Sequence, residues 1–150
     1  MESLLLVFAN TAVLGKVKSR LAKSIGEKKA LWIYHKLLAN TEGVLQNTFL
    51  KVVIFYDGKN ANEFKGCFKD FAKKPQKGKD LGERMTNAFE WAFNQGYPKV
   101  IGIGTDLWEI NSELIKKAFD ENLTLKEAAL KLNLISGKEF DRIVDPKKMI

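Results

Sequence analysis

The chain has 150 residues, of which 45% are hydrophobic and 29% are charged, a composition that excludes a disordered chain and is typical of one globular domain with a core. No apolar run is long enough to cross a bilayer, and Glu2 stands where a signal peptide has positively charged residues. The chain has one cysteine and one histidine, which excludes an internal disulfide and a structural zinc site. We therefore expect a cytoplasmic protein without membrane contact, and the net charge of +7 favours an anionic partner such as a nucleotide, a phosphorylated metabolite or nucleic acid.

The first third of the chain predicts a strand and two helices. The segment 3–9, which is continuously apolar after Ser3, is typical of a strand buried on both faces of a parallel sheet. A loop with one glycine follows over 12–18, and a helix is expected to begin at its end. Leucines at helical spacing predict a second, longer helix over 27–46.

The middle of the chain predicts another strand and another helix. The segment KVVIFYDG, 51–58, is a second buried strand closed by an Asp-Gly turn. The segment 61–74 is ambiguous, with a short strand expected near 71–74. Asp80 and Glu83 have the spacing of a capping box, which predicts a helix from Asp80 to Gln95.

The segment KVIGIGTD, 99–106, predicts a further buried strand, followed by a helix from Asn111 or Ser112 to about Asp120. Strands that alternate with helices indicate right-handed crossovers. The predicted fold is therefore α/β, a Rossmann-like three-layer sandwich with a mostly parallel sheet of about four strands in the order 3-2-1-4.

The last part of the chain, 122–150, contains no further buried strand and predicts two short helices, from Thr124 and from Ser136. We therefore divide the chain into 1–121 and 122–150. The helix pair also fits a helix-turn-helix DNA-binding unit. Charge argues against that interpretation, because 122–150 holds six Lys/Arg and four Asp/Glu, so that only two of the seven net charges lie there.

Two groups of candidate site residues follow predicted strands, at the sheet edge where open parallel sheets bind ligands. The stretch LGKVKSRLAK places Lys16, Lys18 and Arg20 after a glycine and contains no acid, which suits contact with phosphate. Asp106 ends the last strand and could hold a divalent ion that bridges phosphate oxygens. Together they predict a nucleotide site, whereas each alone is also compatible with a solvated helix start and a turn cap.

Three blocks resemble, in order and spacing, a bacterial family of glycosyltransferase-like proteins with the GT-A (nucleotide-diphospho-sugar transferase) fold, of the radical-SAM/selenodomain-associated type. The blocks are FANTAVLGKVKSRLAKSIGEKKALWIY, QKGKDLGERMTNAF and VIGIGTDLWEI, and the resemblance covers about 4–118. It implies that Asp106 has a metal-ion role, with Mg²⁺ or Mn²⁺. It also implies nucleotide contacts, which we assign to Gly15, Lys16, Lys18, Arg20, Leu81, Gly82 and Arg84.

The chain departs from that family in two ways. The usual proline before the glycine of the first block is absent, because Leu14 precedes Gly15, and the usual Ser-Asp is Thr105-Asp106. The further strands and the glycine-rich DGGYY segment that build the acceptor half are also absent. The sequence therefore reads as a truncated domain of this kind.

The tail TLKEAALKLNLISGKEFDRIVDPKKMI resembles the C-terminal domain of class II fumarases and aspartate ammonia-lyases, over about 116–150. The signature serine loop of those lyases, GSSxMPxKxN, is absent, so their chemistry is not implied. We expect this tail to dock where the missing half would have packed, on the exposed edge of the last strand. The same edge could instead pair with a second copy of the chain and form a homo-oligomer.

The leading functional expectation is a nucleotide-sugar transferase-like domain that binds a nucleotide or nucleotide-sugar at most, because the acceptor half is missing. The alternative is a non-catalytic fusion whose only property is its fold. Nucleic-acid binding by the tail is the least favoured expectation.

Overall fold

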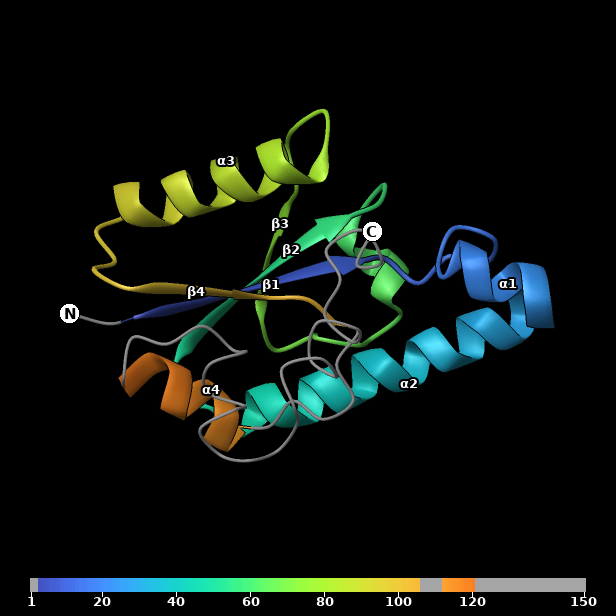
Figure 1. The fold of residues 1–150 in the computed structure, drawn as a ribbon, viewed down its shortest axis with the longest axis horizontal. Coiled ribbons are helices and arrows are strands. Elements are labelled where there is room, and N and C mark those ends of the chain that lie inside the picture. Colours follow the sequence, from blue (N-terminus) through green and yellow to red (C-terminus); the bar gives the residue numbers. More distant parts are fainter. Residues whose placement is uncertain (1–2, 106–111, 121–150) are drawn as a thin grey trace, which may run out of the picture.

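The computed structural model describes residues 3–105 and 112–120. Four parallel strands form one sheet with the order β3-β2-β1-β4, as the sequence predicts (Figure 1). The strands are β1 (Leu4–Asn10), β2 (Lys51–Asp57), β3 (Ala72–Pro75) and β4 (Val100–Ile103). Strands β1 and β2 pair in register along their whole length, from Leu4 opposite Lys51 to Asn10 opposite Asp57, so that their carboxyl ends coincide.

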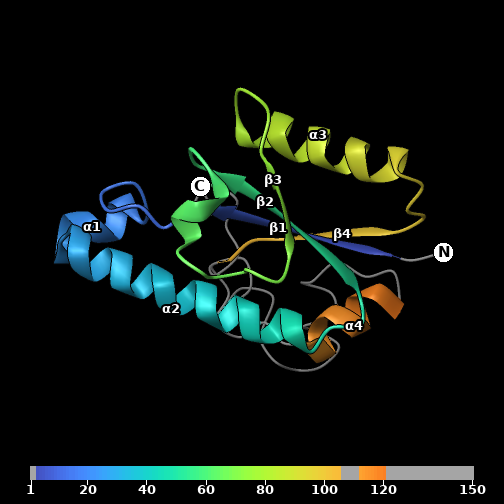
Figure 2. The same cartoon turned by 180° about the vertical axis from the view of Figure 1, so that it is seen from behind.

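Helices cover both faces of the sheet and make the expected three layers. The helix α3 (Leu81–Asn94) lies on one face, and α2 (Glu27–Gln46) and α4 (Ser112–Asp120) lie on the other (Figures 1 and 2). A short helix α1 (Ser19–Ile25) precedes α2, and a 3₁₀ turn η1 (Ala61–Phe64) follows β2.

The central strand shows why its sequence is apolar throughout. Alternate side chains point to opposite faces of a strand, so both faces of a covered strand need apolar residues. Leu5 and Val7 join the core under α2, whereas Leu4 and Leu6 join the core under α3. The partners contributed by the helices are Tyr34, Leu38 and Leu45 of α2, Ala88 and Ala92 of α3, and Ile115 of α4.

Helix boundaries agree closely with the sequence-based expectations. The first helix begins at Ser19 because Lys18, its N-cap, adopts a left-handed conformation with φ 52°. In α3 the Asp80 side chain accepts a hydrogen bond from the Glu83 N–H at 2.8 Å, as a capping box requires. The reciprocal bond goes one residue further back, because the Glu83 carboxylate accepts from the Lys79 N–H at 3.3 Å.

Several expectations fall outside the described residues. They are the placement of Asp106, the two helices of 122–150, the division of the chain after residue 121, and the docking of the tail. These stay predictions. The last strand itself is shorter than the expected 99–106, because β4 ends at Ile103 and residues 104 and 105 no longer pair with β1. Within 3–105 and 112–120, the helices are all too short or too polar to span a membrane.

Candidate functional site

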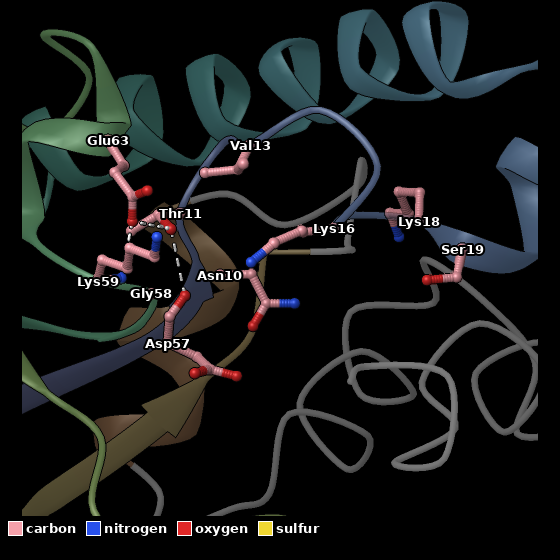
Figure 3. A pocket seen from close by; sticks show the side chains of 10 residues that line it. All are labelled: Asn10, Thr11, Val13, Lys16, Lys18, Ser19, Asp57, Gly58, Lys59 and Glu63. Carbon is pink, nitrogen blue, oxygen red and sulfur yellow. Dashed lines mark hydrogen bonds between the residues drawn. The ribbon is translucent and has the colours of Figure 1, made fainter.

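A pocket of about 440 Å³ opens where β1 and β2 end (Figure 3). Side chains from the loop after β1 and from the loop after β2 line it together. The lining residues are Asn10, Thr11, Val13, Lys16, Lys18, Ser19, Asp57, Gly58, Lys59 and Glu63. The pocket therefore combines three lysines with two carboxylates at the ligand-binding edge of an open parallel sheet.

Thr11 forms the floor of the pocket, and only 3% of this residue is exposed to solvent. Its N–H donates to the Asp57 carbonyl at 2.9 Å, which continues the pairing of β1 with β2. Its hydroxyl donates to Glu63 Oε1 at 3.1 Å. These bonds hold the loop after β2 against the end of β1.

The carboxylate of Glu63 is engaged by protein donors. Its Oε1 accepts from the Lys59 N–H at 2.7 Å and from the Asn60 N–H at 3.4 Å, in addition to the Thr11 hydroxyl. The bond from the Lys59 N–H is the largest reason why the pKa of Glu63 lies below its ordinary value. The negative charge of Glu63 is thus stabilised from within the loop.

Acidification is expected to loosen this loop only below the ordinary pKa of Glu63, 4.5. Because the pKa is lowered in the folded state, the stabilisation is fully present above the ordinary value and is lost as the pH falls through the lower folded-state value. The Lys59 amide chemical shift, followed by NMR during acidification, should therefore move with a midpoint below 4.5. In the Glu63→Gln control this transition should vanish, and a wild-type midpoint above the ordinary value would contradict the expectation.

The second carboxylate, Asp57, is paired with an arginine of α3. Arg84 Nη1 lies 2.8 Å from Asp57 Oδ2, and Arg84 Nε donates to the Gly78 carbonyl at 3.1 Å. Asn87 Nδ2 donates to the Lys77 carbonyl at 2.8 Å. These contacts hold the loop before α3 beside the pocket.

The lysines reach the pocket from two sides. In Figure 3, Lys59 lies with Glu63 on one side of the view, Lys18 lies with Ser19 on the other, and the Lys16 side chain extends between them toward Asn10. Since both carboxylates already have protein partners, the pocket is suited to an anionic ligand.

The structure brings together only part of the predicted basic group. Lys16 and Lys18 line the pocket, and Gly15, with φ 80°, lies inside the turn that the Lys16 N–H closes on the Val13 carbonyl at 3.0 Å. Such a left-handed turn favours glycine over any residue with a Cβ. Arg20 is exposed on α1 and is not among the lining residues, so its nucleotide contact stays a prediction without geometric support.

The residues of the second block lie beside the pocket rather than in it. Leu81 and Gly82 form the first turn of α3 and are not among the lining residues. Arg84 reaches the pocket through its ion pair with Asp57. Asp106 lies outside the described residues, and its metal role stays a prediction.

Sequence reasoning missed Thr11 after β1, and it missed the contribution of the end of β2 and the loop after it, namely Asp57, Lys59 and Glu63. One signal could have found part of it. Asp57 ends a strand that the predicted order sets next to β1, so the rule applied to the first and last strands applies to it as well. The Thr11–Glu63 hydrogen bond joins residues 52 positions apart, so no local sequence pattern predicts it.

Among the described residues, no group of three or more His, Cys, Asp or Glu side chains could hold a metal ion. Of the two carboxylates of the pocket, Glu63 accepts hydrogen bonds from the protein and Asp57 forms an ion pair with Arg84. The described part of the pocket thus offers anion-binding rather than metal-binding groups.

A second hollow of about 380 Å³ lies between α2 and the segment after η1, and includes His35, Glu42 and Cys67. The pKa of Cys67 is raised to about 12, mainly by burial of the thiol and to a smaller extent by the neighbouring Glu42. The thiol is therefore protonated near neutral pH and is no nucleophile.

The fold and its likeness to a solved structure define the class of protein. The chain has the fold of a nucleotide-diphospho-sugar transferase: it matches the crystal structure of a "putative nucleotide-diphospho-sugar transferase" from Desulfovibrio desulfuricans G20 with a TM-score of 0.74 and 32% identity. The match covers 81% of this chain and 55% of that one. The chain belongs to the family described as uncharacterized protein conserved in bacteria (DUF2064), whose model matches residues 40–132.

Short stretches of the chain also match class II fumarate hydratases. The enzyme of Methanosarcina acetivorans is 59% identical over 39 residues, which are 26% of this chain and 8% of that protein. The enzyme of Bacillus cereus is 54% identical over 43 residues, which are 29% and 9%. These matches support the likeness of the tail to class II fumarases, and the chain spans less than a tenth of the length of these relatives.

Proposed function

We propose that the pocket at the ends of β1 and β2 binds the diphosphate of a nucleotide or nucleotide-sugar. The observation that carries this proposal is the gathering of Lys16, Lys18 and Lys59 around a pocket whose carboxylates are engaged by Thr11 and Arg84. Ammonium groups form short charge-assisted hydrogen bonds to phosphate oxygens. The likeness to a nucleotide-diphospho-sugar transferase supports a ligand of this class.

The proposal extends to a metal site. Asp106 would hold Mg²⁺ or Mn²⁺, which would supply positive charge to the phosphate groups. It directly follows Thr105 in the chain, just beyond β4, and β4 runs parallel to β1.

Thermal unfolding tests the proposal. UDP-, GDP-, CDP- and ADP-sugars are added one at a time, with Mg²⁺ or Mn²⁺ and with EDTA. A ligand that binds the native state alone raises Tm with concentration. A rise with at least one nucleotide supports the proposal, and a larger rise with metal supports the Asp106 site. No rise with any nucleotide overturns it.

Replacing Lys16 and Lys18 by alanine is expected to weaken nucleotide binding by roughly 1–3 kcal/mol for each charge-assisted bond that is lost. Both residues are on the rim of the pocket rather than in the core, so the free energy of unfolding should change little. Isothermal titration calorimetry measures the affinity, and urea unfolding measures the stability.

The matched control is Lys36→Ala, which removes an exposed lysine of α2 whose ammonium lies 5.2 Å from the Trp32 ring. It changes the net charge by the same amount as one pocket variant, so equal losses would mean that only net charge matters. An Arg20→Ala variant tests the third predicted cation. If the Lys16 and Lys18 variants bind as tightly as the parent, the two lysines are surface charges.

A second candidate, a fusion without activity, is favoured by the lengths of the matches. The chain spans 55% of the solved transferase-like chain, and short fumarase-like stretches accompany that part. A Tm that no nucleotide changes supports this candidate.

Two further expectations have their own tests. Salt-dependent binding to duplex DNA would support the helix-turn-helix interpretation of the tail. Sedimentation tests the predicted self-association of the chain.

A further inference from the structure

Arg84 occupies a bridging position that the family resemblance does not explain. It lies on α3, outside the lining residues, yet its guanidinium contacts two other elements. Nη1 lies 2.8 Å from the Asp57 carboxylate on the pocket wall, and Nε donates to the Gly78 carbonyl in the loop before α3. Two edges of the guanidinium are therefore directed at protein acceptors.

We propose that Arg84 is a positioning residue that neutralises Asp57, and that it promotes anion binding in this way rather than by contact with the phosphates. The inference rests on the proposed function, because it concerns the anion affinity of the same pocket. It differs from the expectation from the resemblance, in which Arg84 lies beside the nucleotide.

The loop before α3 holds Arg84 in this position. A Cβ built on Gly78 would lie 2.7 Å from the Arg84 backbone nitrogen, so the loop packs directly on the first turns of the helix. The Asn87 side chain holds the same loop through the Lys77 carbonyl. Turning the guanidinium toward a ligand would break the Gly78 and Asp57 contacts together.

The exposure of the pair indicates that its effect is on binding rather than on folding. The Asp57 side chain is 48% exposed and that of Arg84 is 28% exposed. Ion pairs at such sites contribute little to stability. An uncompensated carboxylate in the wall of an anion pocket, in contrast, repels the ligand directly.

A double-mutant cycle tests this inference. The affinities of wild type, Arg84→Gln, Asp57→Asn and the double variant are measured by calorimetry for UDP, GDP, CDP, ADP and inorganic diphosphate. Arg84→Gln should weaken binding roughly 3- to 30-fold, as expected for one unpaired charge near an anion at a partly exposed site. The double variant should return to within about threefold of wild type, because the repelling charge is gone.

Asp57→Asn alone should bind at least as tightly as wild type, and Arg84→Lys, which keeps the positive charge, should recover part of the loss in Arg84→Gln. A direct phosphate contact by Arg84 predicts the opposite for the double variant, which would stay as weak as Arg84→Gln. That result overturns the inference. If Arg84→Gln does not fold, as judged by circular dichroism and urea unfolding, Asp57→Asn decides, since weakened binding in this variant contradicts the inference.

The two failures are distinguishable. If wild type binds none of the probes, the proposed function fails and the inference falls with it. If wild type binds but removal of the Asp57 charge does not rescue Arg84→Gln, the pocket binds anions and only the role of Arg84 is wrong.

Discussion

Replacing Gly58 by alanine is expected to lower the free energy of unfolding by roughly 2–4 kcal/mol. A Cβ at this position would lie 2.0 Å from Thr11 Oγ1 and 2.8 Å from Thr11 Cβ. Thr11 is buried and bonded to Asp57 and Glu63, so it cannot move aside without losing those bonds. Urea unfolding measures the change, and nucleotide affinity should fall as well because the same contact forms the floor of the pocket.

The matched control for this variant is Gly43→Ala in α2. A Cβ at Gly43 meets no atom within 4 Å, so alanine should be neutral or stabilise the helix by up to about 1 kcal/mol. Gly58 does not have a positive φ, so the loss expected at Gly58 is steric. A Gly58→Ala variant whose unfolding free energy stays within about 0.5 kcal/mol of wild type would show that the two loops adjust freely.

The sheet could be predicted from the sequence because its two longest strands are visible as continuous apolar runs. The runs LLLVFA and VVIFY within β1 and β2 are continuously apolar, which is typical of a strand covered on both faces. Right-handed crossovers through the helices then leave few orders, and 3-2-1-4 is the one observed. The helix α3 could be predicted for a similar reason, since Asp80 caps it through a contact only three residues long.

The pocket could be predicted in part because its chemistry depends on contacts between distant residues. Lys16 and Lys18 were visible as cations after a strand. The partners of the two carboxylates could not be predicted, because Glu63 accepts from the Thr11 hydroxyl and the charge of Asp57 is compensated by Arg84. Each of these pairs is formed only when β1, β2 and α3 have assembled.

The segment after η1 is the other feature that local patterns could not give. Lys65, Gly66 and Phe68 all have positive φ, at 53°, 93° and 60°. For a residue as bulky as phenylalanine this conformation is strained and persists only where the surroundings hold it. Phe68 is fully buried, with its ring against Phe64 and Phe71.

Replacing Glu42 by alanine is expected to lower the free energy of unfolding by roughly 2–3 kcal/mol, because it removes the acceptor that holds this strained segment. Glu42 Oε2 accepts the Phe68 N–H at 2.6 Å, and without it the N–H next to a buried ring has lost its partner. Urea unfolding measures the effect. Glu42→Gln keeps an amide oxygen at the same place and is expected to lose less than half as much.

The same pair of variants should change the reactivity of Cys67, which gives a readout independent of stability. Glu42 is one of the reasons why the pKa of Cys67 is raised to about 12, after burial. Since the carboxylate disfavours the thiolate through its charge and its hydrogen bond, both variants should shift the pH profile of iodoacetamide alkylation to lower pH. Burial remains in both, so the midpoint should stay above the ordinary value of 9.0. A profile that both Glu42→Ala and Glu42→Gln leave unmoved would mean that burial alone raises the pKa of Cys67 and that Glu42 acts only through the Phe68 N–H.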